Sequence, residues 1–267
     1  MPDADPAPRA TYPGVCLVTG AASGIGAATA RRLATDGAKA LVLVDRNGGA
    51  LRALGDELEQ AYGVALYLCH QDILSEEGWD GIEHGVTHHW GGLDTVVINA
   101  GVSDAGSIAG LSLEAWRSVV SVNLDGTFLT LRTAMRLLRD GGAAVVVSSA
   151  SAVKAEPGTA AYGASKAAGL QLARVAAKEG AARGIRINAI LPGGVETPIW
   201  QGVPAFNELV TEAGSEQAAF DRMAGFATPL GHYAKPDEIA GQIAFLLSPA
   251  ARSMTGSALV VDGGYML

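Results

Sequence analysis

Short apolar runs alternate with longer helical patterns along almost the whole chain of 267 residues. Several runs are continuous stretches of Val, Ile and Leu, which is typical of parallel strands that are covered on both faces. The predicted strands are Val15–Thr19, Ala40–Val44, Ala65–Cys69, Thr95–Ile98, Ala144–Ser148, Ile185–Ile190 and Ala258–Val261. The predicted helices between them are Ile25–Thr35, Ala50–Tyr62, Glu76–Trp90, Leu113–Arg139, Thr159–Arg183 and Asp237–Leu247.

This alternation predicts an α/β fold. Right-handed βαβ units would build a single Rossmann-like, doubly wound parallel sheet of about seven strands with helices on both faces. A chain of this length suits one large core and is short for two. We expect residues 14–267 to form one domain and residues 1–13, rich in Ala, Pro and Asp, to form a flexible tail. One long irregular stretch is expected from Pro198 to about Lys235.

Charge and hydropathy argue against two classes of partner. The net charge of −8 is unsuited to a basic nucleic-acid-binding surface. No run reaches the ~18 apolar residues of a membrane span, and the N-terminus lacks the basic start and apolar centre of a secretory signal. Cys16 and Cys69 lie in apolar runs without CxxC spacing, so we expect buried free thiols. That expectation fits a reducing, cytoplasmic location.

A glycine-rich turn, Thr19–Gly26, follows the first predicted strand and opens the first predicted helix. Its glycines permit a tight turn and allow the backbone to approach a phosphate group closely. The helix N-terminus then offers free N–H groups and a positive dipole end. The glycine spacing is GxxxGxG, and its position directly after an apolar strand favours dinucleotide binding.

Asp45 ends the second predicted strand, 19 residues after Gly26. An acid at this position can accept hydrogen bonds from the adenosine ribose and repel a 2′-phosphate, although it can also serve as a helix cap. Arg46 follows, and an arginine can accept a 2′-phosphate. The pair favours NAD over NADP as the cofactor.

Tyr162 and Lys166 are four residues apart in an Ala/Gly-rich run that is typical of a helix. Four residues are about one helical turn, so both side chains lie on the same face. A nearby ammonium lowers the pKa of a phenol, which makes the pair suited to proton transfer in alcohol and ketone chemistry. Such a pair also occurs by chance on solvated helices, so it carries weight only together with the other motifs.

In combination, these motifs resemble the short-chain dehydrogenase/reductase family over about residues 14–265. Thr19–Gly26 is similar to the family's TGxxxGIG turn, and Asn99-Ala100-Gly101 to its NAG motif. Ile98 stands where the family usually has a first Asn, a departure that we expect to concern packing. Pro192–Pro198 resembles the PGxVxTP loop, and Val260–Tyr265 the C-terminal strand and turn.

The resemblance implies four catalytic residues: Asn123, Ser149, Tyr162 and Lys166. Ser149 lies 13 residues before Tyr162, the family's usual spacing. Tyr162 would be the acid/base, Ser149 would orient the substrate oxygen, and Lys166 would lower the pKa of Tyr162 and bind the nicotinamide ribose. Asn123 would anchor a water that links Lys166 to solvent. The hydride moves between the substrate carbon and the nicotinamide, so no metal is needed.

The resemblance also implies cofactor contacts beyond the glycine turn. Asp72 would contact the adenine, and Val195 and Thr197 would hold the carboxamide end. The expected cofactor-binding residues are Gly20, Ser23, Gly24, Ile25, Gly26, Asp45, Arg46, Asp72, Ile73, Asn99, Ala100, Gly101, Tyr162, Lys166, Pro192, Gly193, Val195 and Thr197.

Residues 198–234 are expected to cover the substrate as a lid. Their apolar side chains either contact the substrate or only pack the lid on the body; they are Ile199, Trp200, Val203, Phe206, Leu209, Val210, Phe220, Met223 and Phe226. Arg222 is the only arginine of the segment and could pair with a carboxylate. His84 and His88 have the i,i+4 spacing of a metal pair, but without an obvious third ligand we expect a solvated helix face.

The chain is therefore expected to be an oxidoreductase that transfers a hydride between NAD(H) and a hydrophobic secondary alcohol or ketone, including a cyclic one. Its partners would be a small-molecule substrate and, by family resemblance, three further copies in a homotetramer. Two alternatives stay open: a reductase of 3-oxoacyl thioesters, and a non-catalytic NAD-binding regulatory protein. The second would need none of the four catalytic residues, and a methyltransferase would have no use for the Tyr–Lys pair.

Overall fold

The computed structural model describes residues 10–267, so most of the predicted tail lies outside the described residues. Seven strands form one parallel sheet in the order β3-β2-β1-β4-β5-β6-β7, which confirms the predicted doubly wound fold. The strands are β1 Val15–Thr19, β2 Ala40–Asp45, β3 Ala65–His70, β4 Leu93–Ile98, β5 Leu138–Val147, β6 Arg186–Pro192 and β7 Ala258–Val261. The helices are α1 Gly24–Thr35, α2 Gly48–Tyr62, α3 Glu76–Trp90, α4 Leu113–Val120, α5 Gly126–Leu137, α6 Ala160–Gly180, α7 Pro204–Ala213, α8 Glu216–Ala227 and α9 Pro236–Leu247.

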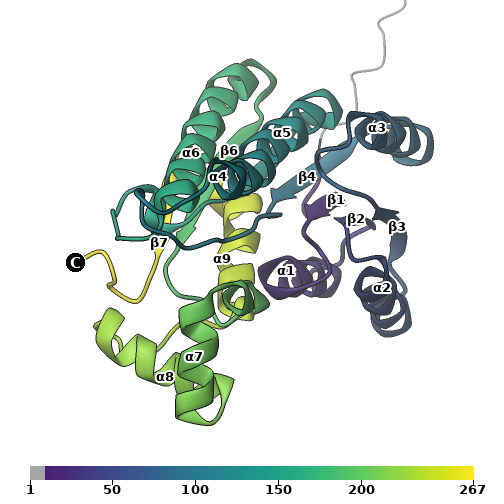
Figure 1. The fold of residues 1–267 in the computed structure, drawn as a ribbon. Coiled ribbons are helices and arrows are strands. Elements are labelled where there is room, and N and C mark those ends of the chain that lie inside the picture. The colour runs from purple at the N-terminus through teal and green to yellow at the C-terminus, as the bar shows by residue number, and fades with distance from the viewer. Residues whose placement is uncertain (1–9) are drawn as a thin grey trace, which may run out of the picture.

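Helices cover both faces of the sheet, with α1, α2 and α9 on one face and α3, α5 and α6 on the other (Figure 1). Along β2, Leu41 and Leu43 pack under the first set, whereas Val42 and Val44 pack under the second. Successive strand side chains point to opposite faces, so a strand covered on both faces is apolar at most positions. This explains the continuous apolar runs over residues 15–18 of β1, 40–44 of β2 and 96–98 of β4.

The long helix predicted over Leu113–Arg139 is wrong in two respects. α4 ends at Val120, and a π-helical turn, Ser121–Asp125, separates it from α5. The side chain of Asn123 in this turn is bonded to the backbone of Val102 on another segment. The helix also ends at Leu137, because Leu138 already pairs with Leu93 as the start of β5.

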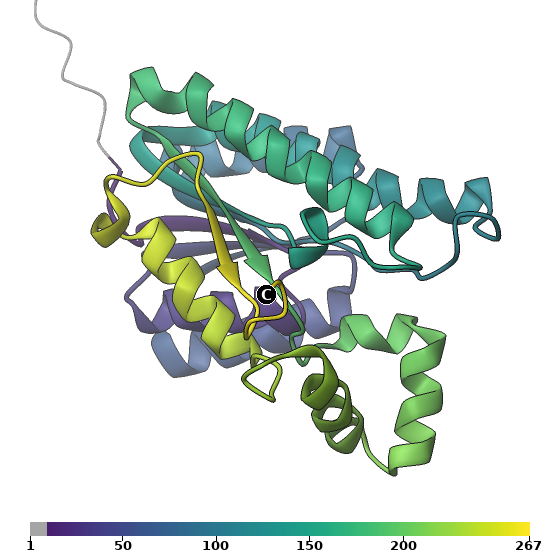
Figure 2. The ribbon, with the colours of Figure 1, turned by 90° about the vertical axis from the view of Figure 1, so that its left-hand side faces the viewer.

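Residues 198–234, which we expected to be irregular, are largely helical. A short 3₁₀ turn is followed by α7 and α8, which project beyond the sheet (Figures 1 and 2). Pro204 opens α7, where the missing N–H costs nothing. The hydroxyl of Ser215 caps α8 by accepting a hydrogen bond from the N–H of Ala218, at 3.2 Å. Phe206 and Phe220 pack between the two helices.

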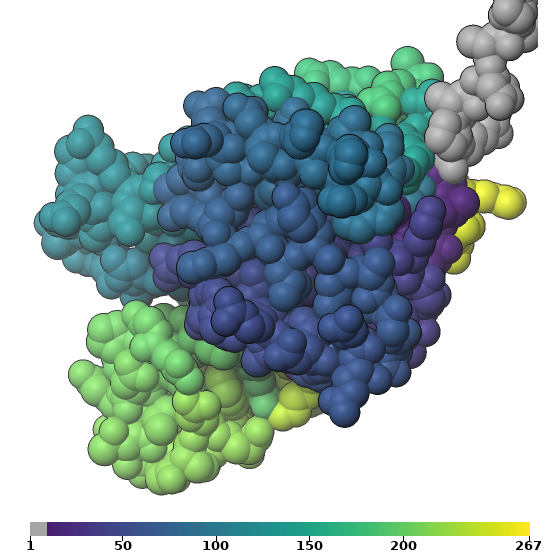
Figure 3. Space-filling model, turned by 90° about the vertical axis from the view of Figure 1, so that its right-hand side faces the viewer, coloured from purple at the N-terminus to yellow at the C-terminus, as the bar shows by residue number. Residues whose placement is uncertain are grey.

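The carboxyl ends of all seven strands meet at one edge of the sheet, because every pairing is parallel. Neighbouring strands β1 and β4 feed connections that leave in opposite directions, toward β2 and β5. Open α/β sheets bind ligands in the crevice at such a switch point. In Figure 3 a hollow separates the lid helices, in light green, from the teal part of the chain.

Asp94 in β4 provides a test of what holds the N-terminal end of the sheet together. Its carboxylate accepts hydrogen bonds from the N–H groups of Thr11 and Val15, at 2.9 and 2.6 Å, and pairs with Arg139 at 2.8 Å. The two charged side chains are only 5% and 13% exposed. Asp94→Ala leaves a buried charge and two N–H groups unpaired, so we expect it to lower the free energy of unfolding by about 3–5 kcal/mol in urea denaturation.

The control is Glu57→Ala, which breaks the exposed pair with Arg31 and should cost less than about 1 kcal/mol. If Asp94→Ala and Glu57→Ala lowered the free energy of unfolding equally, the stabilising role of the buried Asp94–Arg139 pair would be contradicted.

Candidate active site

Two adjoining cavities open at the carboxyl edge of the sheet and share Ile25, Asn99, Gly101, Thr197 and Ile199. The first lies over the ends of β1, β2, β3 and β4, and the second over the ends of β5 and β6. Of the predicted cofactor residues, the first is lined by Gly20, Ser23, Gly24, Ile25, Asp45, Arg46, Asp72, Ile73, Asn99, Ala100, Gly101 and Thr197. The second is lined by Ser149, Tyr162, Lys166, Pro192, Gly193 and Val195 among others.

The glycine turn forms the floor of the first cavity. Gly20 and Gly24 have φ of +62° and +51°, which side chains rarely adopt. Gly26 is inside α1, where a Cβ would lie 2.0 Å from the carbonyl oxygen of Gly20. Gly26 therefore does not line a cavity but allows the turn to fold back on its helix. Among the described residues, the side chain of Ser23 makes no capping bond at the helix N-terminus, so the first N–H groups of α1 are available to an anion.

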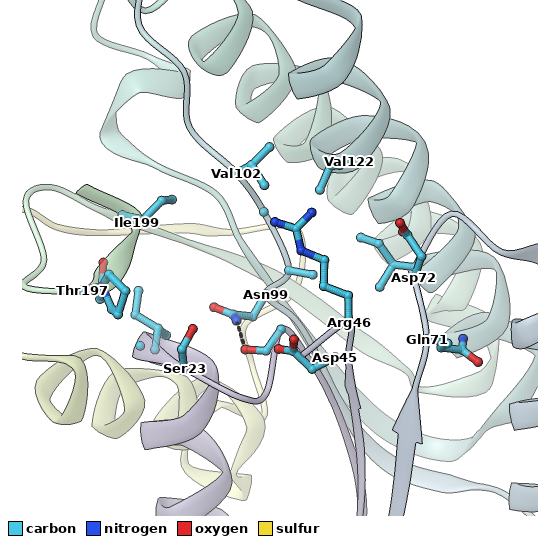
Figure 4. A pocket seen from close by; sticks show the side chains of 17 residues that line it. Ser23, Asp45, Arg46, Gln71, Asp72, Asn99, Val102, Val122, Thr197 and Ile199 are labelled. Atoms are coloured by element: carbon cyan, nitrogen blue, oxygen red, sulfur yellow. Dashed lines mark hydrogen bonds between the residues drawn. The ribbon is translucent and has the colours of Figure 1, made fainter. Parts of the chain in front are cut away.

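Asp45 and Arg46 lie together at the mouth of the first cavity (Figure 4). The carboxylate of Asp45 accepts from the N–H of Ala22 in the glycine turn at 2.9 Å and from the N–H of Asn47 at 2.8 Å. These two bonds orient the carboxylate at the end of β2. Arg46 is exposed. Asp72 also lines this cavity, with one oxygen accepting from the N–H of Leu74.

Asn99 joins the end of β4 to the glycine turn. Its amide nitrogen donates to the carbonyl oxygens of Thr19 and Gly20, at 3.0 and 3.1 Å, and Figure 4 shows it pointing toward the turn. The Thr19 hydroxyl in return accepts from the N–H groups of Asn99 and Ala100. Ile98, which replaces the family's usual first Asn, is buried in the core, as expected.

Ser149, Tyr162 and Lys166 meet in the second cavity. Ser149 follows β5, whereas Tyr162 and Lys166 lie on one face of α6. The ammonium of Lys166 donates to the carbonyl oxygen of Val147 at 3.0 Å and lies 5.7 Å from the centroid of the Tyr162 ring. The three predicted residues are therefore brought together at the end of β5.

Burial dominates the protonation of this group. It raises the pKa of Tyr162, while the neighbouring Ser149 hydroxyl lowers it. Burial also lowers the pKa of Lys166 to about 8. Both shifts favour the neutral form of the side chain. The prediction that Lys166 lowers the pKa of Tyr162 is therefore not met in this structure, where burial raises that pKa and the Ser149 hydroxyl is the group that lowers it.

Asn123 lies in the π-helical turn and is buried. Its Oδ1 accepts from the N–H of Val102 at 2.8 Å, and its Nδ2 donates to the carbonyl oxygen of Val102 at 2.9 Å and to the Ser165 hydroxyl at 3.1 Å. It lines neither cavity. It instead fastens the segment after β4 to α6, and π-helical turns of this kind often lie at functional sites.

The loop after β6 closes the second cavity from the lid side. Gly194 lies under the ring of Tyr233, where a Cβ would approach ring atoms to 2.3 Å. Tyr233 stacks on Trp200 with centroids 5.8 Å apart and planes 16° apart, and Trp200 donates from Nε1 to the carbonyl oxygen of Val195 at 2.9 Å. These contacts join the loop to the lid.

The apolar residues of the lid divide between the two roles left open by the sequence. Ile199, Trp200 and Val203 line the second cavity, whereas Phe206 and Phe220 pack inside the lid. Phe226 is 91% exposed and does neither. Arg222, considered as a carboxylate partner, lies at the surface within 3.7 Å of Glu212 and lines neither cavity.

Several lining residues were missed by the sequence analysis: Gln71, Val102, Val122, Ser103, Asp104, Ala105, Ser151, Thr159, Gly194, Tyr233 and Tyr265. Most lie within seven residues after a strand end, Tyr265 included, so their place at the carboxyl edge could have been inferred. Val122, Thr159 and Tyr233 had no comparable signal.

The histidines and cysteines that the sequence analysis considered lie outside the two cavities. The rings of His84 and His88 stack on each other at 6.4 Å on α3, and residues 10–267 contain no cluster of three or more His, Cys, Asp or Glu side chains able to hold a metal. Cys16 and Cys69 are buried and free. Within the same part of the chain, every helix is too short or too polar to cross a bilayer.

The chain is similar to known proteins over nearly its whole length. Residues 20–266 match the sequence family described as enoyl-(acyl carrier protein) reductase. The cis-4-hydroxycyclohexanecarboxylate dehydrogenase of Sinomonas cyclohexanicum is 38% identical, and the match covers 94% of this chain and 96% of that protein. The 3-oxoacyl-(acyl-carrier-protein) reductase of Thermotoga maritima is 33% identical over 95% and 98% of the two chains.

A solved structure shows the same fold. The crystal structure of L-sorbose reductase from Gluconobacter frateurii, complexed with NADPH and L-sorbose, aligns with a TM-score of 0.88 at 30% identity, covering 94% of this chain and 96% of that one. Fold, site and relatives define an oxidoreductase built on a dinucleotide-binding sheet. The chain belongs to the short-chain dehydrogenase/reductase family.

Gly194 allows a test of the contact between the loop and the lid. Gly194→Ala places a methyl group against the ring of Tyr233, so we expect it to lower the free energy of unfolding by about 1–3 kcal/mol in urea denaturation. The matched control is Gly225→Ala in α8, where a Cβ meets nothing within 4 Å and alanine should stabilise the helix by up to about 1 kcal/mol. A neutral Gly194→Ala would show that Tyr233 moves freely.

Proposed function

We propose that this protein is an NAD-dependent dehydrogenase/reductase that interconverts a neutral, hydrophobic, cyclic secondary alcohol and its ketone. The observation that carries the proposal is the continuity of the two cavities. The glycine turn and Asp45 line one, while Ser149, Tyr162 and Lys166 line the other, and Asn99, Gly101 and Thr197 belong to both. A dinucleotide in the first cavity would therefore end beside the Ser–Tyr–Lys group.

The lining fits such a cofactor. The N–H groups at the start of α1 suit a pyrophosphate, and Val195 and Thr197, which line the second cavity, would hold the nicotinamide end. When bound, the cofactor accepts or supplies the hydride, and the protein positions it. Lys166 would hydrogen-bond the nicotinamide ribose.

Tyr162 would act as the acid/base for the substrate oxygen. In oxidation its phenolate takes the alcohol proton, and in reduction its phenol returns a proton to the alkoxide. Ser149 would hold the same oxygen through its hydroxyl, which already lowers the pKa of Tyr162. The ammonium of Lys166 would stabilise the phenolate, and Asn123 would keep the route from Lys166 toward solvent in place.

Cofactor preference would follow from charge. Asp45 is anchored by two backbone N–H groups and lines the first cavity. It would accept hydrogen bonds from the ribose hydroxyls and repel a 2′-phosphate. Arg46 opposes this preference, and we propose that the anchored carboxylate prevails.

Size and charge define the substrate class. The second cavity holds about 290 Å³ and is mainly apolar. The nicotinamide end would take part of this volume, so the space left suits a substrate no larger than about a single six-membered ring. The Sinomonas relative is named for a cyclohexane carboxylate. Here, among the described residues that line the cavity, Lys166 is the only cation and Asp104 adds a carboxylate. A neutral ring therefore fits better than an acid.

A second candidate activity is reduction of 3-oxoacyl thioesters, which the Thermotoga relative's name describes. The same four residues would serve it. The test compares two rates of turnover, that of acetoacetyl-CoA with NADPH and that of cyclohexanone with NADH. A higher rate for acetoacetyl-CoA would favour this alternative. A regulatory NAD-binding protein would show cofactor binding without turnover of either.

We further propose a cytoplasmic homotetramer. Three exposed apolar side chains on the outer helices are available for subunit contacts: Leu113 of α4, Phe128 of α5 and Val175 of α6, which are 61%, 48% and 44% exposed. Light scattering of the purified protein measures the assembly directly.

The central test follows the reduced-nicotinamide absorbance with NAD⁺ and cyclohexanol. We expect turnover that rises with pH by about tenfold per unit at the acidic end, because Tyr162 must lose its proton before it accepts one and burial raises its pKa. Tyr162→Phe should lower kcat by about 10²–10⁴-fold with NAD⁺ affinity retained. Tyr62→Phe, an exposed tyrosine on α2, is the control. Near-normal turnover by Tyr162→Phe would refute the mechanism.

Asp45→Asn tests the cofactor assignment, since it removes the charge and retains an oxygen for the N–H of Ala22. We expect the ratio of kcat/KM for NAD⁺ to kcat/KM for NADP⁺ to fall at least about tenfold. Most of this change should be a rise in kcat/KM for NADP⁺, because repulsion of its 2′-phosphate is lost. Asp56→Asn on the exposed side of α2 removes the same charge elsewhere and should leave the ratio in place. An unchanged ratio in Asp45→Asn would show that another residue sets the preference.

A further inference from the structure

The chain turns back after β7 and delivers its C-terminal residues to the second cavity. Figure 2 shows the C-terminus at the carboxyl ends of β6 and β7, between α6 and the lid. Asp262 holds this turn, because its two carboxylate oxygens accept from the N–H groups of Gly264 and Met266, both at 2.9 Å. The turn places Tyr265 in the lining of the cavity that also contains Ser149 and Tyr162.

Lys154 fastens Tyr265 in this position. Its ammonium donates to the carbonyl oxygen of Tyr265 at 2.6 Å and lies 3.8 Å from the centroid of the Tyr265 ring. It also lies 3.4 Å from the carboxylate of Glu156. A hydrogen bond to the backbone and a cation over the ring together restrain both the position and the tilt of the side chain.

The chain segment that carries Lys154 begins with Ser149. The contact therefore links the C-terminal turn directly to the segment that supplies a proposed catalytic hydroxyl. Burial and the neighbouring Glu156 carboxylate both raise the pKa of Tyr265, so its phenol stays neutral. Its ring offers an uncharged aromatic surface.

Tyr265 has no place in the core. The three hydrophobic clusters of the described residues do not include it, although they include Tyr233. Gly263 and Gly264 both have positive φ, +62° and +88°, which turns the chain back toward the cavity. This backbone conformation is costly for any residue but glycine. It places one aromatic ring, that of Tyr265, at the cavity wall.

We propose that Tyr265 is a specificity-determining residue that contacts the carbon skeleton of the substrate, and that Lys154 is the positioning residue that holds it there. The inference rests on the proposed function, because it assigns a wall of the same substrate cavity. It predicts that the contact matters for a ring-sized alcohol and not for a small one.

The test compares kcat/KM for cyclohexanol and for 2-propanol in Tyr265→Ala, Lys154→Met and the double variant. We expect Tyr265→Ala to lower the value for cyclohexanol about tenfold and that for 2-propanol less than about twofold. Lys154→Met should lower the cyclohexanol value about threefold, and the double variant should match Tyr265→Ala, since Lys154 acts through Tyr265. Met266→Ala and Lys178→Met, which alter neither the cavity lining nor the contacts of Lys154 with Tyr265, are the controls.

A second measurement is independent of activity. Carboxypeptidase Y should release Tyr265 at least about fivefold faster from Lys154→Met than from the wild type or Lys178→Met, as followed by mass spectrometry. Equal release rates would overturn the role of Lys154. Equal losses for both alcohols would overturn the role of Tyr265 in specificity.

The failure of the proposed function would look different. A wild-type protein that binds NAD⁺ but oxidises neither alcohol would contradict the function and the specificity role together, while the release of Tyr265 would still decide whether Lys154 holds the C-terminal turn.

Discussion

The hydrogen bonds between Asn99 and the glycine turn hold the site together. The ladder between β1 and β4 ends with Val18 opposite Val97. Beyond that point the amide of Asn99 and the hydroxyl of Thr19 continue the attachment, with four bonds of 3.0–3.1 Å. The glycine turn and the segment after β4 both line the first cavity. Their relative position at the end of the sheet therefore depends on these side chains.

The same attachment extends to the second cavity through Gly101. A Cβ at Gly101 would lie 3.1 Å from Oδ1 of Asn123 and 3.1 Å from Nζ of Lys166, so the backbone there fits between the two side chains. Asn123 is in turn bonded to both backbone groups of Val102. A displacement of Asn99 would thus reach Lys166 through two residues of backbone, and Asn99 and Gly101 line both cavities.

The parts of this structure that could be predicted rest on local patterns. Continuous apolar runs identified the strands, and the GxxxGxG spacing identified a turn that only glycine can make. The π-helical turn at Asn123 could not be predicted, because the Asn123 side chain bonds there to Val102, 21 residues earlier, and not within its own helix. The caps at Pro204 and Ser215 were present in the sequence but were overlooked. Tyr233 reaches the cavity only through the tertiary path of the lid, for which the chain has no periodic signal.

Tyr162 and Lys166 affect each other's ionisation in the second cavity. Each side chain resists ionisation, since desolvation raises the pKa of the phenol and lowers that of the ammonium. Ionisation of one makes ionisation of the other less costly, because opposite charges attract. In the proposed reaction an alkoxide formed beside Ser149 would draw on the same ammonium, so proton transfer between substrate and Tyr162 would exchange one stabilised anion for another.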